Sequence, residues 1–233
     1  MTVSGIAEVE SLAGPQVAER PEPFLAWPGW KHIGYTTLLG LLNTLWFTLV
    51  FVGADSLTAH RSFRVRVHFS WELGIPLVPA MILFYMSIYL AFLAAPFIVR
   101  RRQEVRALVG TLALVILLSG IGFLLFPADL AFVPPDEKAL GVWAAMFHLA
   151  DKLNLTYNLV PSLHVALVVA CVAVFSTHAP ARGKALLWLW AALIAVSTVL
   201  THQHHVLDAV TGWLLAVICV RVAYTRLVAM QSV

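Results

Sequence analysis

The stretch LTHQHHVLDAVTG, residues 200–212, carries three histidines and an aspartate between two strongly apolar segments. Apolar residues on both sides predict a short connection between two membrane-spanning helices. An ionisable side chain at membrane depth costs about 2.5–3.5 kcal/mol, so it normally has a partner or a function. The stretch therefore predicts a helical hairpin and, at its turn, a functional site.

The rest of the chain is equally apolar. Of its 233 residues, 61% are hydrophobic and only 12% are charged, and its mean hydropathy is +0.86. A soluble domain is about 45–50% apolar and about 25% charged. The composition predicts a polytopic membrane protein, in which the formal charge of +3 reports topology and no nucleic-acid partner is expected. Cys171 and Cys219 lie inside apolar runs, which favours neither a disulfide nor a metal site.

The fold class predicted from this pattern is all-α, a polytopic membrane bundle of six transmembrane helices. A spanning helix needs about 20 apolar residues, and six segments meet or approach that length: 33–53, 75–99, 105–126, 162–178, 185–202 and 206–224. We expect residues 31–233 to form one membrane domain, with its catalytic constellation within 127–212. Residues 1–30 lack the order of a cleaved signal and are expected to form a flexible cytoplasmic arm.

Between the third and fourth segments, residues 137–154 alternate apolar and polar side chains at helical spacing. This pattern is consistent with an amphipathic helix at the membrane interface.

Lysine and arginine positions predict the orientation. Ten of them fall on the side that holds the amino terminus and five on the other side. The positive-inside rule then makes both termini cytoplasmic and turns the 55–74 and 127–161 loops and the 201–205 turn outward. We expect a multi-pass protein of a bacterial inner membrane whose active site faces outward.

The polar residues on that outer side form a chemical constellation. His204 and Asp208 are spaced i, i+4, so a carboxylate can fix the tautomer of a histidine. His164 follows Pro161 and Ser162, which are typical of a helix start where an anion is favoured. An oriented histidine, a second histidine and an anion-binding terminus indicate phosphoryl transfer through a phosphohistidine. This chemistry needs no metal or other cofactor.

The same residues resemble a known family. PSLH (161–164), followed about 40 residues later by HHVLD (204–208), resembles the type 2 phosphatidic acid phosphatase superfamily over roughly residues 70–224. The positions that match its second and third motifs are Pro161, Ser162 and His164, and Ser197, His204 and Asp208. The PSLH form and the IPLVP…Y run (75–85) look most like the branch that contains sphingomyelin and inositol-phosphorylceramide synthases.

The resemblance implies a lipid phosphatase or phosphotransferase that acts on a phospholipid or lipid phosphate at the outer membrane face. His204 would be the nucleophile, Asp208 would orient it, and His164 would protonate the leaving oxygen. Two alternatives stay open: a headgroup-transferring, sphingolipid-type synthase, and a non-catalytic lipid-binding protein on the same scaffold. The expected contacts to substrate or phosphate come from Ser162, Lys152, His205, His202 and Ser197. For His202 and His205, a purely interfacial position is the alternative.

The sequence departs from the family at its phosphate-clamping cations, which fall here on Phe126, Val133 and Thr198. Either the substrate is a phosphodiester that needs less of a clamp, or other cations substitute. Lys152 is the first candidate, followed by Lys138, His202 and the group Arg61, Arg64 and Arg66. Glu72, at the start of the second span, is expected to pair with a nearby arginine. Three histidines and an aspartate are also metal-ligand types, but the H-x-H-H-x-x-D spacing does not place three of them on one helix face.

Overall fold

The computed structural model describes residues 23–230, so most of the predicted amino-terminal arm, residues 1–22, lies outside it. The described chain is helical without strands, which confirms the all-α fold class. Its elements are α2 (Trp30–Ala59), η1 (Ser70–Gly74), η2 (Pro79–Met81), α3 (Ile82–Met86), α4 (Ile88–Ile98), α5 (Arg102–Leu125), α6 (Glu137–Leu140), η3 (Gly141–Trp143), α7 (Ala144–Leu153), α8 (Leu163–His178), α9 (Ala181–Leu200), α10 (Val206–Cys219), the π-helical segment η4 (Val220–Tyr224) and α11 (Thr225–Met230).

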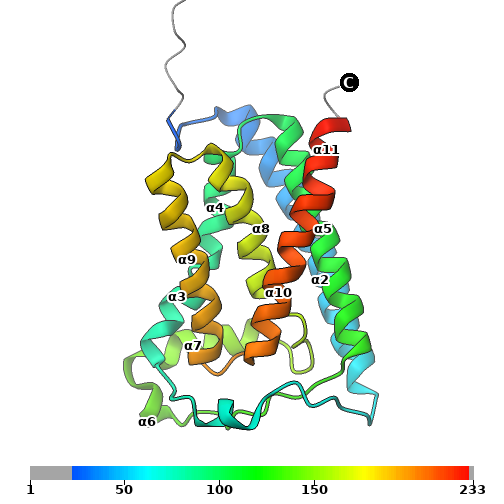
Figure 1. Ribbon diagram of the computed structural model, residues 1–233, viewed down its shortest axis with the longest axis vertical. Coiled ribbons are helices and arrows are strands. Elements are labelled where there is room, and N and C mark those ends of the chain that lie inside the picture. Colours follow the sequence, from blue (N-terminus) through cyan, green and yellow to red (C-terminus); the bar gives the residue numbers. More distant parts are fainter. Residues whose placement is uncertain (1–22, 231–233) are drawn as a thin grey trace, which may run out of the picture.

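Long apolar helices run side by side through most of the molecule (Figure 1). Among the described residues, five stretches are long and apolar enough to cross a membrane: Trp30–Ala59, Pro79–Ile98, Arg102–Leu125, Ala181–Leu200 and Val206–Met230. The apolar helix α8 has 16 residues and is the sixth of the bundle. Both ends of the described chain lie at the same end of the bundle, as an even number of spans requires (Figure 1). The chain is an integral membrane protein.

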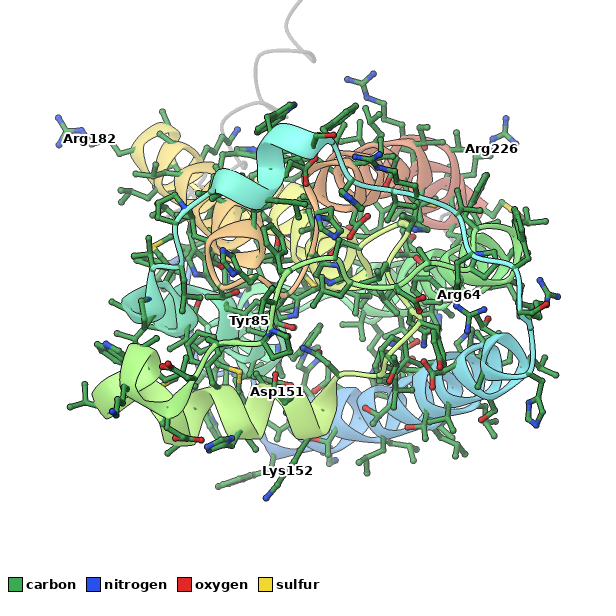
Figure 2. The ribbon with its side chains drawn as sticks, turned by 90° about the horizontal axis from the view of Figure 1, so that it is seen from below. Arg64, Tyr85, Asp151, Lys152, Arg182 and Arg226 are labelled. Atoms are coloured by element: carbon green, nitrogen blue, oxygen red, sulfur yellow. The ribbon has the colours of Figure 1, made fainter. Side chains whose placement is uncertain are left out.

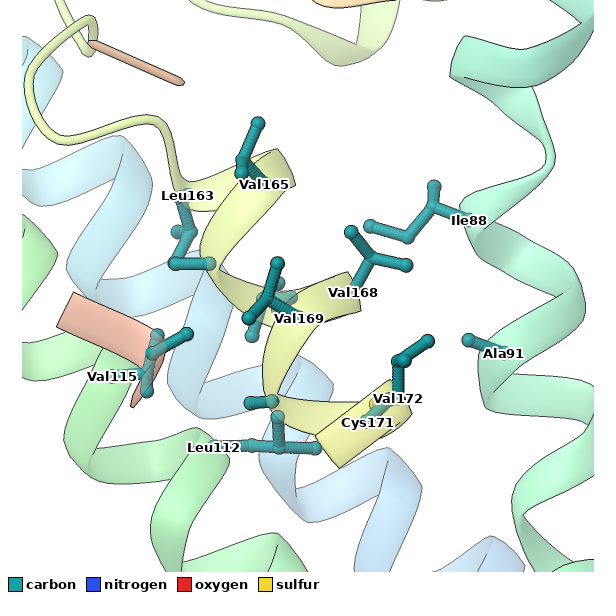
Figure 3. Close-up of a cluster of buried hydrophobic side chains, with 14 of the residues drawn as sticks. Ile88, Ala91, Leu112, Val115, Leu163, Val165, Val168, Val169, Cys171 and Val172 are labelled. Atoms are coloured by element: carbon teal, nitrogen blue, oxygen red, sulfur yellow. The ribbon is translucent and has the colours of Figure 1, made fainter. Parts of the chain in front are cut away.

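Helix α8 is the centre of the bundle. Eleven of its residues are buried, and it packs against α4, α5, α9 and α10. Figure 3 shows valines of α8 beside Ile88 and Ala91 of α4 and beside Leu112 and Val115 of α5. A helix that is apolar all round belongs in the interior. Its length of ~24 Å is shorter than the ~30 Å hydrocarbon core, but a helix enclosed by protein need not match the bilayer.

The second predicted span is interrupted. The 75–99 segment forms η2, α3 and α4, with the break between α3 and α4 at Ser87. The Ser87 hydroxyl donates to the carbonyl oxygen of Phe84 at 2.6 Å and accepts from Trp190 Nε1 at 2.8 Å. A serine hydroxyl that bonds back to the main chain bends a helix. The break lies two residues after Tyr85, which contributes to the site.

One end of the bundle is covered by irregular chain and by α7, which lies across the spanning helices (Figure 1). We call this end the site end. The amphipathic helix predicted over 137–154 is interrupted at Gly141, whose φ is +52°. Only its second half forms a longer helix, α7. Helix α7 buries Phe147 against Ile82 and Tyr85 of α3. Helix α7 thereby covers the site end of the cavity that residues of α3 and α8 also line.

Candidate active site

The amino-terminal ends of α8 and α10 meet at the site end. Ser162 is the N-cap of α8, and its Oγ accepts from Val165 N at 3.4 Å. Its own N–H donates to the carbonyl oxygen of Asp208 in the first turn of α10 at 2.9 Å. A Cβ at Gly212 would lie 2.3 Å from the Ser162 carbonyl oxygen. Glycine therefore permits the close approach that holds the two predicted motifs together.

His204 and Asp208 are paired. His204 Nδ1 lies 3.4 Å from Asp208 Oδ2, and the same oxygen accepts from the backbone N–H of His205 at 2.8 Å. His204 sits in the predicted turn just before α10, and Asp208 lies in the first turn of that helix, so the i, i+4 spacing brings the two side chains together. Asp208 is fully buried, and its Oδ1 has no hydrogen-bond partner in the described chain. With Nδ1 directed at the carboxylate, Nε2 is the nitrogen left for chemistry.

His164 is held by Tyr85. Its Nε2 donates to the carbonyl oxygen of Tyr85 at 2.8 Å, and its ring stacks on the tyrosine ring with centroids 4.0 Å apart. The helix start at Ser162 and the break after Tyr85 together fix this position. His164 and His204 line the same cavity, with Nδ1 of His164 free of the Tyr85 contact.

This cavity has a volume of about 880 Å³ and two chemically different parts. At the site end its wall is polar, with His164, His202, Gln203, His204 and Asn154. Towards the other end it continues between α2, α4, α5 and α8 over apolar side chains that include Phe47, Phe92, Leu108, Leu112 and Leu167. The cavity therefore combines a polar part with an apolar channel, as a membrane lipid combines a polar headgroup with apolar chains.

His205 is a structural residue. Its Nδ1 donates to Glu72 Oε2 at 3.1 Å, and its Nε2 accepts from Ala131 N at 3.1 Å. Both ring nitrogens are therefore occupied by protein groups. Burial lowers the pKa of His205 below its ordinary value, although Asp208 and Glu72 oppose this change. A neutral ring with its proton on Nδ1 satisfies both bonds, so His205 has no nitrogen left to hold phosphate.

The expectation that Glu72 pairs with an arginine is wrong. Instead of an arginine, its fully buried carboxylate contacts His205 and also accepts from Val206 N at 3.1 Å. Glu72 and Asp208 thus both bond to backbone N–H groups at the start of α10, where negative charge is favoured. The sequence contained a signal for this: Glu72 is the single acidic residue between Asp55 and Glu104, beside an apolar run.

The turn that carries His204 is shaped by Thr198, which stands where the family has an arginine. The Thr198 carbonyl oxygen accepts from Gln203 N at 2.9 Å and from His204 N at 3.0 Å. His202 takes a positive φ of 56°. Its Nε2 donates to the Ile75 carbonyl oxygen at 3.0 Å, and its ring lines the cavity. Ser197 is fully buried and donates to Ile194 O inside α9, so it does not reach the cavity.

The predicted substitute cation does not face the site. Lys152, on α7, extends away from the bundle (Figure 2) and does not line the cavity. Arg64 contacts two residues of the cavity wall: its guanidinium covers the ring of Tyr157 at 4.4 Å and bonds Asp129 at 3.1 Å. Within residues 23–230, no lysine or arginine lines the cavity. The direction of Lys152 follows from the rotation of α7 about its axis. Because the face of α7 that carries Phe147 is buried, the face that carries Lys152 points outward.

Comparison with protein families gives a match to the PAP2 superfamily over residues 66–222. No curated protein and no solved structure gives a significant match to the chain. The matched region is well over half of the chain and contains Glu72, His164, the 201–205 turn and Asp208. Its members are generally phosphatases or phosphotransferases. By the extent of this match, the chain belongs to the PAP2 superfamily.

Proposed function

We propose that this protein is a membrane lipid phosphatase or phosphotransferase that works through a phosphohistidine on His204. The observation that carries the proposal is one cavity on which His204, oriented by Asp208, and His164 both lie, and which continues as an apolar channel. Membership of the PAP2 superfamily supports lipid phosphates as the substrate class.

In the first step, the lone pair of His204 Nε2 attacks phosphorus while the bond from phosphorus to the leaving oxygen breaks. His164, protonated at Nδ1, gives that proton to the leaving oxygen and keeps its Nε2–H on the Tyr85 carbonyl. Asp208 holds the His204 ring and stabilises its positive charge. The amino terminus of α8 contributes about 0.3–1 kcal/mol of attraction for the phosphate oxygens.

In the second step, water or a lipid alcohol attacks the phosphohistidine. The bond from phosphorus to Nε2 breaks, and His164 takes the proton of the attacking group, which restores both histidines. Water gives hydrolysis and an alcohol gives transfer. A phosphomonoester dianion would be poorly held in a cavity without a lining lysine or arginine. A phosphodiester donor, as in the headgroup transfer catalysed in the sphingomyelin and inositol-phosphorylceramide synthase branch, fits better.

The test is incubation of the purified protein in vesicles with a panel of lipid phosphomonoesters and phosphodiesters, with and without lipid alcohol acceptors. Mass spectrometry then identifies the products, and vanadate tests for a phosphoenzyme-type transition state. Release of phosphate from a monoester, or of a phosphorylated headgroup from a diester, supports hydrolysis, and a headgroup on the acceptor supports transfer. Tight binding of one lipid without any product would instead support the non-catalytic alternative.

Asp208→Asn is expected to lower kcat by about 100-fold with little change in KM. Asparagine keeps an oxygen for the His205 N–H, so the turn persists, but it no longer enforces the tautomer of His204 or stabilises its charge. Steady-state kinetics on the best lipid of the panel measure the effect. Asp136→Asn is the matched control, because Asp136 caps α6 outside the cavity. Equal kinetics for the two variants would contradict the role given to Asp208.

We also propose that both termini are cytoplasmic and that the site end faces outward, in a bacterial inner membrane. Val142 in η3 is 90% exposed at the site end, and the native Cys171 and Cys219 are buried. Val142→Cys is therefore expected to react with a membrane-impermeant maleimide on intact spheroplasts. Wild-type protein, with its buried cysteines, gives the background signal. Labelling that appears only after permeabilisation would reverse the orientation.

A further inference from the structure

We propose that the apolar part of the cavity binds one acyl chain of the substrate in an extended conformation, and that Gly40 sets the length of chain that fits. This inference rests on the proposed function, because it concerns the tail of the lipid whose phosphate meets His204. It places a determinant of specificity in the membrane interior, away from the reacting groups.

The apolar part of the cavity is a slot between α2 and α4 that is closed at both ends. At the site end, the Phe51 carbonyl oxygen accepts from Asn158 Nδ2 at 2.7 Å, which ties α2 to the segment before α8. At the other end, His32 Nε2 donates to the Val99 carbonyl oxygen at 3.1 Å, just beyond the last turn of α4. Between these ties, α2 packs mainly against α5 and touches α4 little. The two helices therefore part between two fixed points.

The slot is deeper than one leaflet of a bilayer. Phe51 and Thr36 both line the cavity and are fifteen residues apart on α2, which corresponds to a rise of about 22 Å. Half of a hydrocarbon core is about 15 Å thick. A chain that hangs from a phosphate at His204 therefore fills the slot only if the chain is long and extended.

The wall of the slot suits a hydrocarbon chain. Phe92 of α4 and Leu108 of α5 supply apolar surface on two sides. On α2, the hydroxyls of Thr36 and Thr44 each donate to a carbonyl oxygen of their own helix at 2.9 Å, so both are already bonded. Asn43 adds one amide to the same face of α2. The lining is thus mainly apolar along the depth of the slot.

Gly40 lies near the closed end of the slot, one turn of α2 from Thr36. A Cβ added at Gly40 would have nothing within 4 Å, so bare backbone meets open space there. Side chains of a helix lean towards its amino terminus. A larger side chain at position 40 would therefore lie over the turn of Thr36 and shorten the slot from its closed end. Glycine weakens a helix interior relative to alanine, and here its lack of a side chain leaves the slot open.

The experiment uses phosphatidylglycerols that differ only in their acyl chains: octanoyl, lauroyl, palmitoyl and arachidoyl. Native mass spectrometry of the protein in detergent gives the Kd of each lipid, and diacylglycerol release gives its turnover. The ratio of variant to wild-type Kd on one lipid cancels the different solubilities of the chains. Gly40→Phe should raise the Kd of the palmitoyl and arachidoyl lipids by about 10-fold, the size expected for overpacking, and leave that of the octanoyl lipid unchanged. Gly40→Leu should give a smaller shift of the same kind.

Gly34→Phe is the matched control. Gly34 also lies in α2 with nothing within 4 Å of an added Cβ, but it does not line the cavity, so the whole series should stay unchanged. Gly40→Leu carries the test if the phenylalanine variant does not fold. An equal change of Kd for all four chains, or the wild-type dependence on chain length, in the Gly40 variants would overturn the inference and leave the proposed function standing. Chain-selective binding that yields no product would remove the proposed function and leave the role of Gly40 standing.

Discussion

His204→Ala is expected to form no phosphoenzyme and to lower turnover by about 10⁴-fold or more. Removal of a covalent nucleophile leaves only the catalysis that binding and charge stabilisation provide. The two other histidines of the same turn do not replace it. His205 has both ring nitrogens bonded to protein groups, and His202 is tied to the Ile75 carbonyl and stacked on Phe132 at 4.1 Å.

The measurement is a single-turnover reaction with a lipid labelled in its phosphate, followed by alkaline quench and detection of label on the protein, since phosphohistidine survives base. His148→Ala is the matched control, because His148 is an exposed histidine on α7 that pairs with Glu137 and lies outside the cavity. Similar labelling of His204→Ala and wild-type protein would end the phosphohistidine scheme. Full turnover of a variant that carries no label would do so as well.

The parts of the molecule that the sequence predicted share one physical origin. An ionisable group beside an apolar run is costly, so it stands out in the sequence and has a partner in the structure. This applies to the 200–212 stretch, which forms the turn between α9 and α10 and the first half of α10. It applies equally to Glu72, for which an arginine partner was expected and which contacts His205 and Val206 N instead. The lengths of the apolar segments likewise predicted the membrane helices, because a run of about 20 apolar residues is enough to identify a spanning helix.

The parts that the sequence did not predict depend on contacts between distant segments. Glu72 and His205 are 133 positions apart, so nothing local marks them as partners. The break at Ser87 depends on Trp190, which lies on another helix. Lys152 was a reasonable candidate cation by its position in the loop. Its direction, however, is set by which face of α7 buries Phe147 against α3, and only the packed structure decides that.

Gly212→Ala is expected to destabilise the protein strongly and to lower the activity of the protein that remains folded by about 10²-fold. The added Cβ would lie 2.3 Å from the carbonyl oxygen of Ser162, and also 3.2 Å from its carbonyl carbon and 3.3 Å from its nitrogen. These are backbone atoms at the start of α8, so no side chain can move aside. Overpacking of this kind costs about 1–3 kcal/mol and occasionally more.

Relief of that contact requires α8 and α10 to separate, which stretches the bond from Ser162 N to Asp208 O, now 2.9 Å. His164 and His204 then move apart, and a shift of about 1 Å in a reacting group lowers the rate by about 10²-fold. Thermal unfolding in detergent and the lipid assay measure the two effects separately. Gly53→Ala is the control: Gly53 lies in α2 with nothing within 4 Å of an added Cβ, and alanine favours a helix by about 1 kcal/mol over glycine. If Gly212→Ala melted at the wild-type temperature with full activity, the close approach of α8 and α10 would not be what assembles the site.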